Sequence, residues 1–196
     1  MTRVIADITV SLDGYVTAPG ADLEHGLGVG GESLHDWVLA GDDTDHAVLE
    51  EMTYAAGAVV MGRKTFDLID GPNGWDDEMG FGGDYVAAPP FFVVTHRPVE
   101  KARLPHDFTF VGDLAAAVDK ARGAAGNRDV VVMGGGSIVR QCVVNLLVDE
   151  LHLHISPISL GGGTPLFAEG DRIELTQTDV RPSSNAIHTT YQPANA

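Results

Sequence analysis

The 196-residue chain contains little cysteine, few basic residues and no long apolar run. Cys142 is its one cysteine, so the chain cannot form an internal disulfide, and nothing points to an oxidising compartment. No apolar run approaches the roughly 18 residues that a transmembrane helix requires. The first residues, MTRVIADITV, alternate in polarity and lack the unbroken apolar stretch of a signal peptide. We therefore expect a cytoplasmic protein without a membrane partner.

Basic residues are scarce, because 12 Lys and Arg stand against 28 Asp and Glu and leave a formal charge of −16. Such a charge repels nucleic acid and anionic membrane surfaces at long range, so neither partner is expected. It also opposes an anionic cofactor unless the few cations gather where that cofactor binds. The length and the 44% share of hydrophobic residues predict a single globular domain over residues 1–196. The expected partner is a small-molecule substrate.

Glycine, in contrast, is abundant, with 24 residues. Two glycine-rich segments, 13–33 and 71–90, show no sustained periodicity and are predicted to be loops. Loops of this length in a compact domain usually cover a functional site. In or beside them, Trp37, Trp75 and Phe81 are expected either to stack on a flat substrate or to pin the loops to the core.

Hydrophobic periodicity predicts alternating strands and helices. The strands are expected at 4–12, 58–62, 91–95, 108–111 and 129–133, and the helices at 44–56, at 64–69, after the cap Asp113, and at 137–147. Three further strand-like runs follow at 151–155, 172–180 and 186–192. This order predicts an α/β fold with a mixed, mostly parallel central sheet that is flanked by helices and carries antiparallel C-terminal strands.

The strongest local motif is VVVMGGGSIVRQ (130–141), in which a buried strand turns through three glycines into an apolar helix. Glycines let backbone N–H groups approach a phosphate, and a helix N-terminus adds partial positive charge. The motif is not the usual dinucleotide fingerprint, because Val139 stands where GxGxxG has its third glycine. The segment therefore predicts either a phosphate-binding turn or a tight strand-to-helix turn without a ligand.

Basic residues gather after two of the expected strands. Arg63 and Lys64 follow the first strand, and Thr95, His96 and Arg97 follow the second. Ligands of open α/β sheets bind at the carboxyl ends of strands, and an arginine near a ribose accommodates a 2′-phosphate. The two clusters therefore favour NADP over NAD. The alternative is that both are ordinary solvated strand ends.

The chain carries five motifs in one order over most of its length. They are SLDGYV (11–16), VVMGRKTF (59–66), VVTHRP (93–98), VVVMGGGSIVRQ (130–141) and DELHLHISPISLGGGTPLF (149–167). Together they resemble the dihydrofolate reductase-like family, and most closely the branch with the reductase domain of bacterial riboflavin biosynthesis. The resemblance implies a dihydrofolate reductase-like fold and NADPH as the hydride donor. It also implies a pterin, a folate-like molecule or an amino-pyrimidine related to riboflavin biosynthesis as the substrate, and it is compatible with a homodimer.

The same resemblance implies which residues contact the cofactor. Arg63, Lys64 and Thr65 match the motif that holds the 2′-phosphate and pyrophosphate, and segment 95–97 matches the loop that completes the adenosine-phosphate pocket. In segment 134–138, backbone amides meet the pyrophosphate and a Gly–Gly peptide can be cis; the loop after the first strand approaches the nicotinamide. The implied cofactor-binding residues are Gly14, Val16, Gly62, Arg63, Lys64, Thr65, Thr95, His96, Arg97, Gly134, Gly135, Gly136, Ser137 and Ile138.

Two carboxyl groups compete for the role of proton donor. An ungapped count places the helical carboxylate of folate reductases at His46, beside Asp45. Asp13 is the rival, and the favoured one, because relatives of the riboflavin branch carry SLDG at the substrate mouth. An ordinary Asp-Gly turn also explains Asp13. We expect burial beside the neutral nicotinamide to raise the pKa of whichever carboxyl acts.

The ambiguous proton donor keeps a second function open, a non-catalytic NADPH-dependent binder or sensor on the same fold. No metal site is expected, because His152 and His154 share one strand face without a third ligand at zinc-like spacing. The sequence also lacks the H-x-E and P-C-x-x-C zinc motif of a deaminase, so a combined deaminase and reductase is not expected.

Overall fold

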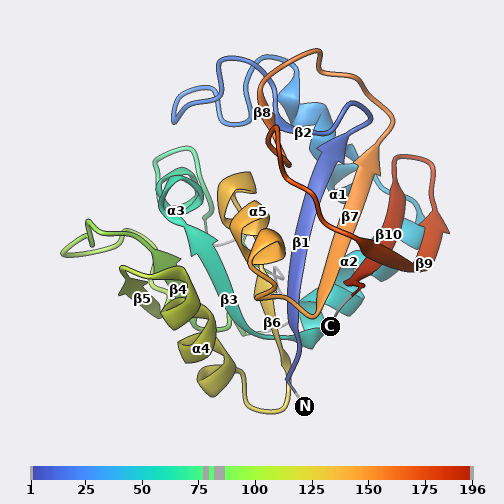
Figure 1. The fold of residues 1–196 in the computed structure, drawn as a ribbon. Helices are drawn as coiled ribbons and strands as arrows, with labels where there is room; N and C mark the ends of the chain where they lie inside the picture. Colours follow the sequence, from blue (N-terminus) through green and yellow to red (C-terminus); the bar gives the residue numbers. More distant parts are fainter. Residues whose placement is uncertain (1, 77–79, 82–86, 195–196) are drawn as a thin grey trace.

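The computed structural model describes residues 2–76, 80–81 and 87–194, and its elements follow the predicted alternating order (Figure 1). The strands are β1 (Val4–Ser11), β2 (Tyr15–Thr17), β3 (Ala56–Gly62), β4 (Phe91–Val94), β5 (Phe108–Val111), β6 (Asp129–Val132), β7 (Glu150–Ser156), β8 (Thr164–Pro165), β9 (Leu175–Pro182) and β10 (Ile187–Pro193). The helices are α1 (Asp36–Leu39), α2 (Asp43–Ala55), α3 (Arg63–Ile69), α4 (Leu114–Ala125) and α5 (Gly136–Val144), with a 3₁₀ turn, η1, at Gly31–His35.

Within these described ranges, eight strands form one sheet in the order β5-β4-β3-β6-β1-β7-β10-β9. β1 pairs in parallel with β6 on one side and with β7 on the other. β3, β4 and β5 continue the parallel part of the sheet. β10 pairs antiparallel with both β7 and β9. The predicted α/β class is confirmed: the sheet is mixed and mostly parallel, and its C-terminal strands pair antiparallel.

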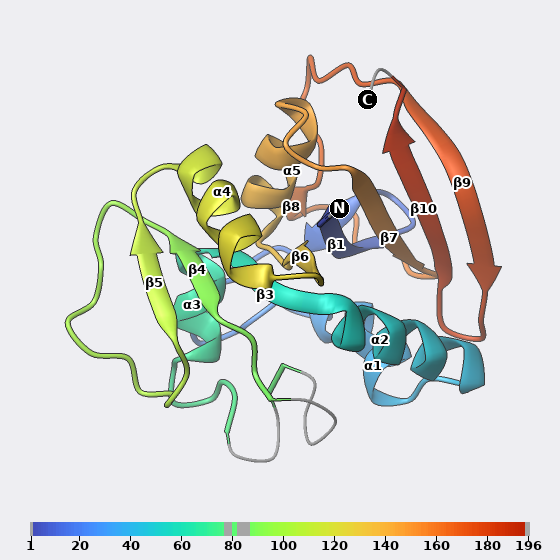
Figure 2. The same ribbon diagram turned by 90° about the horizontal axis from the view of Figure 1, so that it is seen from below.

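Helices cover both faces of the sheet, with α4 and α5 on one face and α1, α2 and α3 on the other (Figure 2). On the first face, Val118 of α4 and Val139 of α5 belong to the same buried cluster as Val4 of β1. On the second face, Phe66 of α3 is buried in one cluster with Met61 of β3. Strands covered on both faces read as unbroken apolar runs, which explains the sequences of β3 and β6.

The expected loop at 13–33 contains short regular elements. β2 pairs antiparallel with β8 and forms a separate two-stranded sheet. Gly163 precedes β8 with a φ of +117°, and a Cβ there would lie 1.9 Å from the carbonyl oxygen of Thr17, so only glycine fits. Leu166 is buried just beyond it. Segment 160–167 therefore holds the first loop in place.

Several element boundaries differ from the predicted ones. α5 ends at Val144 rather than at 147, and Leu146 beyond it has a left-handed φ of 54°. Within α5, Cys142 is buried, and burial raises the pKa of its thiol to about 12. Residues 77–79 and 82–86 of the second expected loop lie outside the described residues. In the part of the chain that is described, no helix is long and apolar enough to cross a membrane.

The predicted cap of α4 provides a direct test of the fold. Asp113 accepts the N–H of Ala116 at 2.8 Å through its side chain. We expect Asp113→Ala to lower the free energy of unfolding by about 1 kcal/mol, because the first turn loses this acceptor. Urea unfolding followed by circular dichroism measures the change. The control is Asp119→Ala, an exposed position inside the same helix, which should leave stability unchanged or slightly raised; equal losses in both variants would contradict the cap.

Candidate functional site

The ends of two neighbouring strands are joined where helices α3 and α5 begin. β3 ends at Gly62, which precedes α3, and β6 leads through Gly134 and Gly135 into α5. The N–H of Gly62 donates to the carbonyl of Gly134 at 2.8 Å. A Cβ added at Gly62 would lie 2.7 Å from Ile138 Cγ1, so the helix packs directly on the strand end. No side chain among the described residues caps the N-terminus of α5. The N–H groups of Ile138 and Val139 donate to the carbonyl oxygen of Gly135, so those of Gly136 and Ser137 are left to an anionic ligand or to water.

The glycine turn after β6 is closely packed by other predicted site residues. Its Gly134–Gly135 peptide is cis, as the family resemblance implies. A Cβ added at Gly136 would lie 2.5 Å from Val16 Cγ2, and one added at Gly135 would lie 3.3 Å from Thr65 Oγ1. The loop after β1 and the first turn of α3 thus meet at the start of α5.

Arg63 joins the ends of β3 and β4. Its Nε donates to Asp67 Oδ1 at 2.7 Å, and its Nη1 donates to the carbonyl oxygen of Arg97. The N–H of Arg97 in turn donates to Thr95 Oγ1 at 3.0 Å. A guanidinium has five N–H donors, and these contacts use two of them. The two basic clusters of the sequence therefore lie side by side, and Arg63 of the first cluster contacts the backbone of the second.

The remaining predicted cofactor residues lie around the same strand ends. Lys64, His96 and Ser137 are exposed. Gly14 lies in the turn after β1, where its carbonyl accepts the N–H of Leu166 at 3.0 Å. All fourteen predicted cofactor residues thus lie at or after the carboxyl ends of β1, β3, β4 and β6, where ligands of such sheets bind. Their contact with a cofactor stays a prediction.

Asp13 is tied to the segment that follows β7. Its carboxylate accepts hydrogen bonds from the Ser11 and Ser159 hydroxyls at 2.6 and 2.9 Å, and from the N–H groups of Leu160 and Gly161 at 3.0 and 2.7 Å. These bonds, that of Ser11 most strongly, hold the pKa of Asp13 well below its ordinary value. The expected rise in pKa is therefore wrong for Asp13, because the donors around it stabilise the ionised form.

Asp45, the rival carboxyl group, is fully buried in the first turn of α2. Its Oδ2 accepts the N–H of Asp42, which completes a capping box at the start of the helix. Its Oδ1 accepts the Ser183 hydroxyl at 2.6 Å and lies 2.8 Å from His188 Nε2. The carboxyl group beside the counted position His46 is thus part of a hydrogen-bond network.

This network continues across three strands of the sheet. His188 Nδ1 of β10 lies 2.7 Å from His154 Nδ1 of β7, and His154 Nε2 lies 3.2 Å from Asp7 Oδ2 of β1. Asp7, His154, His188 and Asp45 are referred to below as the buried chain. Of its four members, His154, His188 and Asp45 are each at most 4% exposed.

The sequence interpretation missed two members of the buried chain and misjudged a third. It singled out neither Asp7 nor His188, and it explained His154 by strand alternation. Strand register places His188 directly opposite His154 on the neighbouring strand. The available signal was a polar side chain between two apolar neighbours at Asp7 and at His154; His188, which lies between Ile187 and Thr189, gave no such signal. Within the described residues, no group of three or more His, Cys, Asp or Glu is arranged to hold a metal ion.

The aromatic residues near the long loops pack into the protein. Trp37 is 4% exposed, and its ring centroid lies 4.3 Å from that of His154. Trp75 and Phe81 each make edge contacts with Phe91, at 6.1 and 6.2 Å between centroids. These contacts favour the anchoring alternative over stacking on a substrate, because the rings already have partners.

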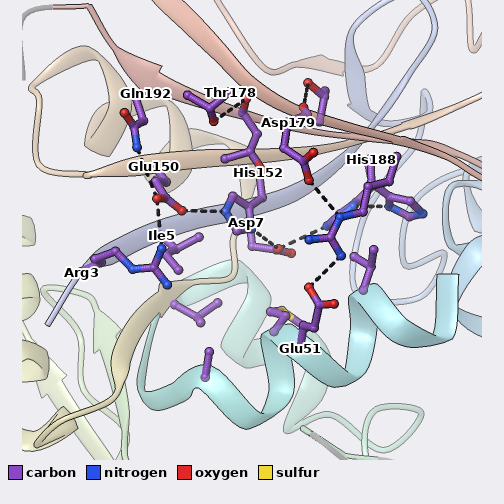
Figure 3. A pocket seen from close by; sticks show the side chains of 18 residues that line it. Arg3, Ile5, Asp7, Glu51, Glu150, His152, Thr178, Asp179, His188 and Gln192 are labelled. Carbon is purple, nitrogen blue, oxygen red and sulfur yellow. Dashed lines mark hydrogen bonds and ion pairs between the residues drawn. The ribbon is translucent and has the colours of Figure 1, made fainter. Parts of the chain in front are cut away.

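A cavity of about 430 Å³ lies between α2 and the strands β1, β7, β9 and β10. Figure 3 shows Asp7 near the middle of its lining, with Glu150 and His152 on one side and His188 on the other. His152 Nε2 lies 3.1 Å from Glu150 Oε2, and its Nδ1 lies 3.8 Å from Asp7 Oδ2. None of the predicted cofactor-binding residues lines this cavity. It borders the buried chain instead.

Comparison with known proteins places these features in a family. Residues 2–189 match the family model described as the RibD C-terminal domain. The chain is also similar to the Uncharacterized protein YyaP of Bacillus subtilis (strain 168), with 25% identity over 193 residues that cover 94% of this chain and 91% of that protein.

Solved structures show the same fold. The chain is similar to a putative riboflavin biosynthesis protein from Shewanella sp. PV-4, with a TM-score of 0.67, 24% identity, and coverage of 98% of this chain and 99% of that one. It is also similar to a deaminase/5-amino-6-(5-phosphoribosylamino)uracil reductase from Thermotoga maritima, with a TM-score of 0.63, 15% identity, and coverage of 98% of this chain and 57% of that one. For dihydrofolate reductase from Enterococcus faecalis complexed with NADP(H), the TM-score is 0.58 and the identity 13%, with coverage of 98% of this chain and 96% of that one. The dihydrofolate reductase-like fold is thereby confirmed.

The contact between Gly136 and Val16 provides a test of the site geometry. We expect Gly136→Ala to lower the free energy of unfolding by about 1–3 kcal/mol, because the added methyl group overpacks against Val16. Urea unfolding measures the loss. Val16→Ala should restore part of it in the double variant, since it removes the obstructing methyl group. Gly123→Ala, in open space on α4, is the control and should not destabilise. Equal stability of Gly136→Ala and the wild type would contradict the contact.

Proposed function

We propose that this chain, which belongs to the RibD C-terminal domain family, is an NADPH-dependent reductase that transfers a hydride to a small heterocyclic substrate. The family match suggests a reductase of riboflavin biosynthesis, and solved relatives of the same fold include a uracil-nucleotide reductase by name. The proposed substrate is an amino-pyrimidine related to that biosynthesis, with pterins and folate-like molecules in the same class of flat heterocycles. A small-molecule partner and a cytoplasmic location complete the proposal.

One observation carries the cofactor assignment, the position of Arg63 and Arg97 beside the glycine turn that opens α5. In a chain with a formal charge of −16, an anion is disfavoured everywhere except where cations and free N–H groups are concentrated. Arg63 bonds to the Arg97 carbonyl, and the adjoining strand end of Gly62 bonds to Gly134. Two cationic segments and an uncapped helix N-terminus therefore occupy neighbouring strand ends.

The residues at these strand ends fit the parts of NADPH by their chemistry. NADPH would supply the hydride when bound. The backbone N–H groups at the start of α5 would hold its pyrophosphate, since the Gly136 position leaves room for no side chain. Arg63 and Lys64 would bind the 2′-phosphate, and Val16 would border the nicotinamide.

Reduction of an imine-like or ring C=N bond also requires a proton. Asp13 is a poor donor, because four hydrogen bonds favour its ionised form. Asp45 is the better of the two carboxyl groups, because it is fully buried and touches a histidine that can exchange a proton with it. We therefore assign the proton donor to Asp45 and a loop-fixing role to Asp13.

A specific observation also favours the second function, a non-catalytic NADPH binder. Both candidate carboxyl groups are already hydrogen-bonded within the protein, Asp13 to the segment after β7 and Asp45 to Ser183 and His188. A binder would keep the glycine turn after β6 for the cofactor, and it would need no carboxyl group that is free to donate a proton to a substrate. The two functions differ in turnover and not in cofactor affinity.

The proposed function is tested by NADPH binding and NADPH oxidation measured separately. Calorimetry or nucleotide fluorescence gives the affinity, and absorbance at the reduced nicotinamide band follows oxidation with a panel of amino-pyrimidines, pterins and folates. A reductase binds NADPH and oxidises it with one member of the panel. Binding without oxidation by any member would favour the binder, and failure to bind NADPH would refute both.

Arg63 gives a test of cofactor selectivity. A hydrogen bond to a charged group contributes about 1.5–3 kcal/mol, so we expect Arg63→Ala to weaken NADPH binding roughly 10- to 150-fold and NADH binding little. Titration of both cofactors measures the difference. Arg122→Ala, which removes an exposed arginine of α4 that pairs with Asp149 and is not among the predicted cofactor residues, is the control and should change neither affinity. Equal losses for both cofactors would show that Arg63 does not recognise the 2′-phosphate.

The two carboxyl groups are separated by their pH dependence. We expect Asp45→Asn to lower the rate of single-turnover NADPH oxidation by about 10²-fold, which is the usual size of a general-acid contribution. Asp13 stays ionised throughout pH 5–9 because its pKa is lowered, so Asp13→Asn should leave the shape of the pH profile unchanged. The measurement is the rate of each variant over that range with the identified substrate. A flattened profile in Asp13→Asn alone would reverse the assignment.

A further inference from the structure

We propose that the buried chain is a proton relay that stores one proton and passes it to the Asp45 carboxyl group. The inference deepens the proposed function and rests on it in one respect, because Asp45 is the acid of the proposed reduction. The inference is carried by the hydrogen-bond geometry of the buried chain and by the position of Asp7, His154 and His188 between the cavity and Asp45.

The relay consists of three consecutive hydrogen bonds between titratable groups. Asp7 Oδ2 and His154 Nε2 are 3.2 Å apart, the two Nδ1 atoms of His154 and His188 are 2.7 Å apart, and His188 Nε2 and Asp45 Oδ1 are 2.8 Å apart. All three separations are within hydrogen-bonding range, so each contact contains one proton between its two heavy atoms. The chain therefore requires three protons.

Counting protons shows that two neutral imidazoles cannot supply them. A neutral imidazole has one N–H, and an ionised carboxylate has none. Two neutral histidines between two carboxylates would thus fill only two of the three contacts and leave two ring nitrogens facing each other without a proton. The third proton must make one histidine an imidazolium or one carboxyl group an acid. The chain of Asp7, His154, His188 and Asp45 then carries one negative charge in total.

One arrangement that fills all three contacts makes His154 the imidazolium, and the relay starts from this arrangement. The pKa of Asp7 is lowered although burial alone would raise it, because His154 attracts its negative charge. Burial lowers the pKa of His188, the positive charge of His154 lowers it further, and the attraction of Asp45 opposes both effects. In this state His154 donates from both nitrogens, to Asp7 and to His188, and His188 donates to Asp45.

Two proton shifts convert this state into one with an acidic Asp45. The Nδ1–H bond of His154 breaks as a new Nδ1–H bond forms on His188. The Nε2–H bond of His188 breaks as an O–H bond forms on Asp45 Oδ1. His154 and His188 are then both neutral, Asp7 remains ionised, and no atom or electron is left unbalanced. Each proton moves across a contact of less than 3 Å.

The surroundings of the relay separate its two ends. Asp7, His154 and His188 border the cavity, from which solvent can return a proton, whereas Asp45 is absent from the cavity lining and is fully buried. Trp37 covers the opposite side of both imidazoles, at 4.3 Å from His154 and 5.1 Å from His188 between ring centroids. Asp45 is thus reached from the cavity through His188.

Other charged groups face the relay from every element around it. They are Glu150 and His152 on β7, Glu51 on α2, Asp179 and Arg181 on β9, Arg3 before β1, and His35 in η1. Arg181 pairs with both Glu51 and Asp179, and Arg3 pairs with Glu150, so two arginines face three carboxylates around the cavity. The negative charge that remains adds to the attraction of the relay's own carboxylates for the third proton.

The number of protons on the two histidines is the first test, and it does not depend on enzymatic activity. Nitrogen-15 NMR of histidine-labelled protein distinguishes protonated from unprotonated ring nitrogens. At pH 7 we expect three of the four ring nitrogens of His154 and His188 to be protonated. His152→Gln, on the same strand but outside the three contacts, is the control and should leave the count at three. A count of two would overturn the imidazolium state from which the relay starts.

Stability against pH is the second test. Above about pH 7 an unfolded histidine is neutral, whereas the folded relay still holds its third proton, so this contribution is present at lower pH and is lost as pH rises. We expect the free energy of unfolding of the wild type to fall from pH 7 to pH 9 relative to His188→Leu. Leucine has no polar side-chain atom, so in this variant His154 needs a proton only on the nitrogen that faces Asp7. Parallel curves for the two proteins would overturn the stored proton.

Delivery to Asp45 is tested by single-turnover NADPH oxidation. His188→Gln should lower the rate about 10²-fold while the NADPH dissociation constant stays unchanged, since His188 lies outside the cofactor turn. His25→Gln, an exposed histidine in the first loop, is the control. An unchanged rate in His188→Gln would overturn delivery. A wild type that holds three protons but oxidises no substrate would instead overturn the proposed function, so the two failures are distinguishable.

Discussion

Parallel hydrogen bonding of β1 to β6 and β7 is the constraint on which both candidate sites depend. Because β1, β3, β4 and β6 run in one direction, the segments after them meet at one edge of the sheet and bring together residues far apart in the sequence. The same pairing aligns the middle of β1 with β7, and β10 then sets His188 opposite His154. The positions of the glycine turn after β6 and of the buried chain both follow from the way these strands pair with β1.

Charge distribution divides the molecule into two electrostatic environments. At the strand ends, Arg63 and Arg97 stand beside an uncapped helix N-terminus in a strongly acidic protein, which favours an anionic ligand there. Inside the sheet layer, carboxylates and histidines are buried together, which is costly unless every polar atom is paired. In the described part of the chain, no buried side-chain nitrogen or oxygen lacks a hydrogen-bond partner. The buried chain meets this condition only with its third proton in place.

The sequence predicted the architecture well, because strand alternation, apolar runs and caps are local signals. The β5 prediction at 108–111 and the Asp113 cap of α4 agree with the structure, and glycine and proline content located the long loops. The segments predicted to bind a cofactor stood out because each of them is a short motif with its own local chemistry. The expected rise in the pKa of Asp13 was wrong, because donors from residues 159–161, which are adjacent to Asp13 only in the fold, also lower this pKa.

What the sequence by itself determined was the order of elements, the net charge and the glycine and arginine motifs, since each follows from neighbouring residues. Tertiary structure alone decided the contact of Gly136 with Val16, the hydrogen bond from Arg63 to the Arg97 carbonyl and the buried chain. Asp7, His154 and Asp45 come from three elements separated by long stretches of sequence. Their protonation depends on distances and burial, and no local pattern encodes either quantity, because both arise only when the strands pair and α2 packs over them.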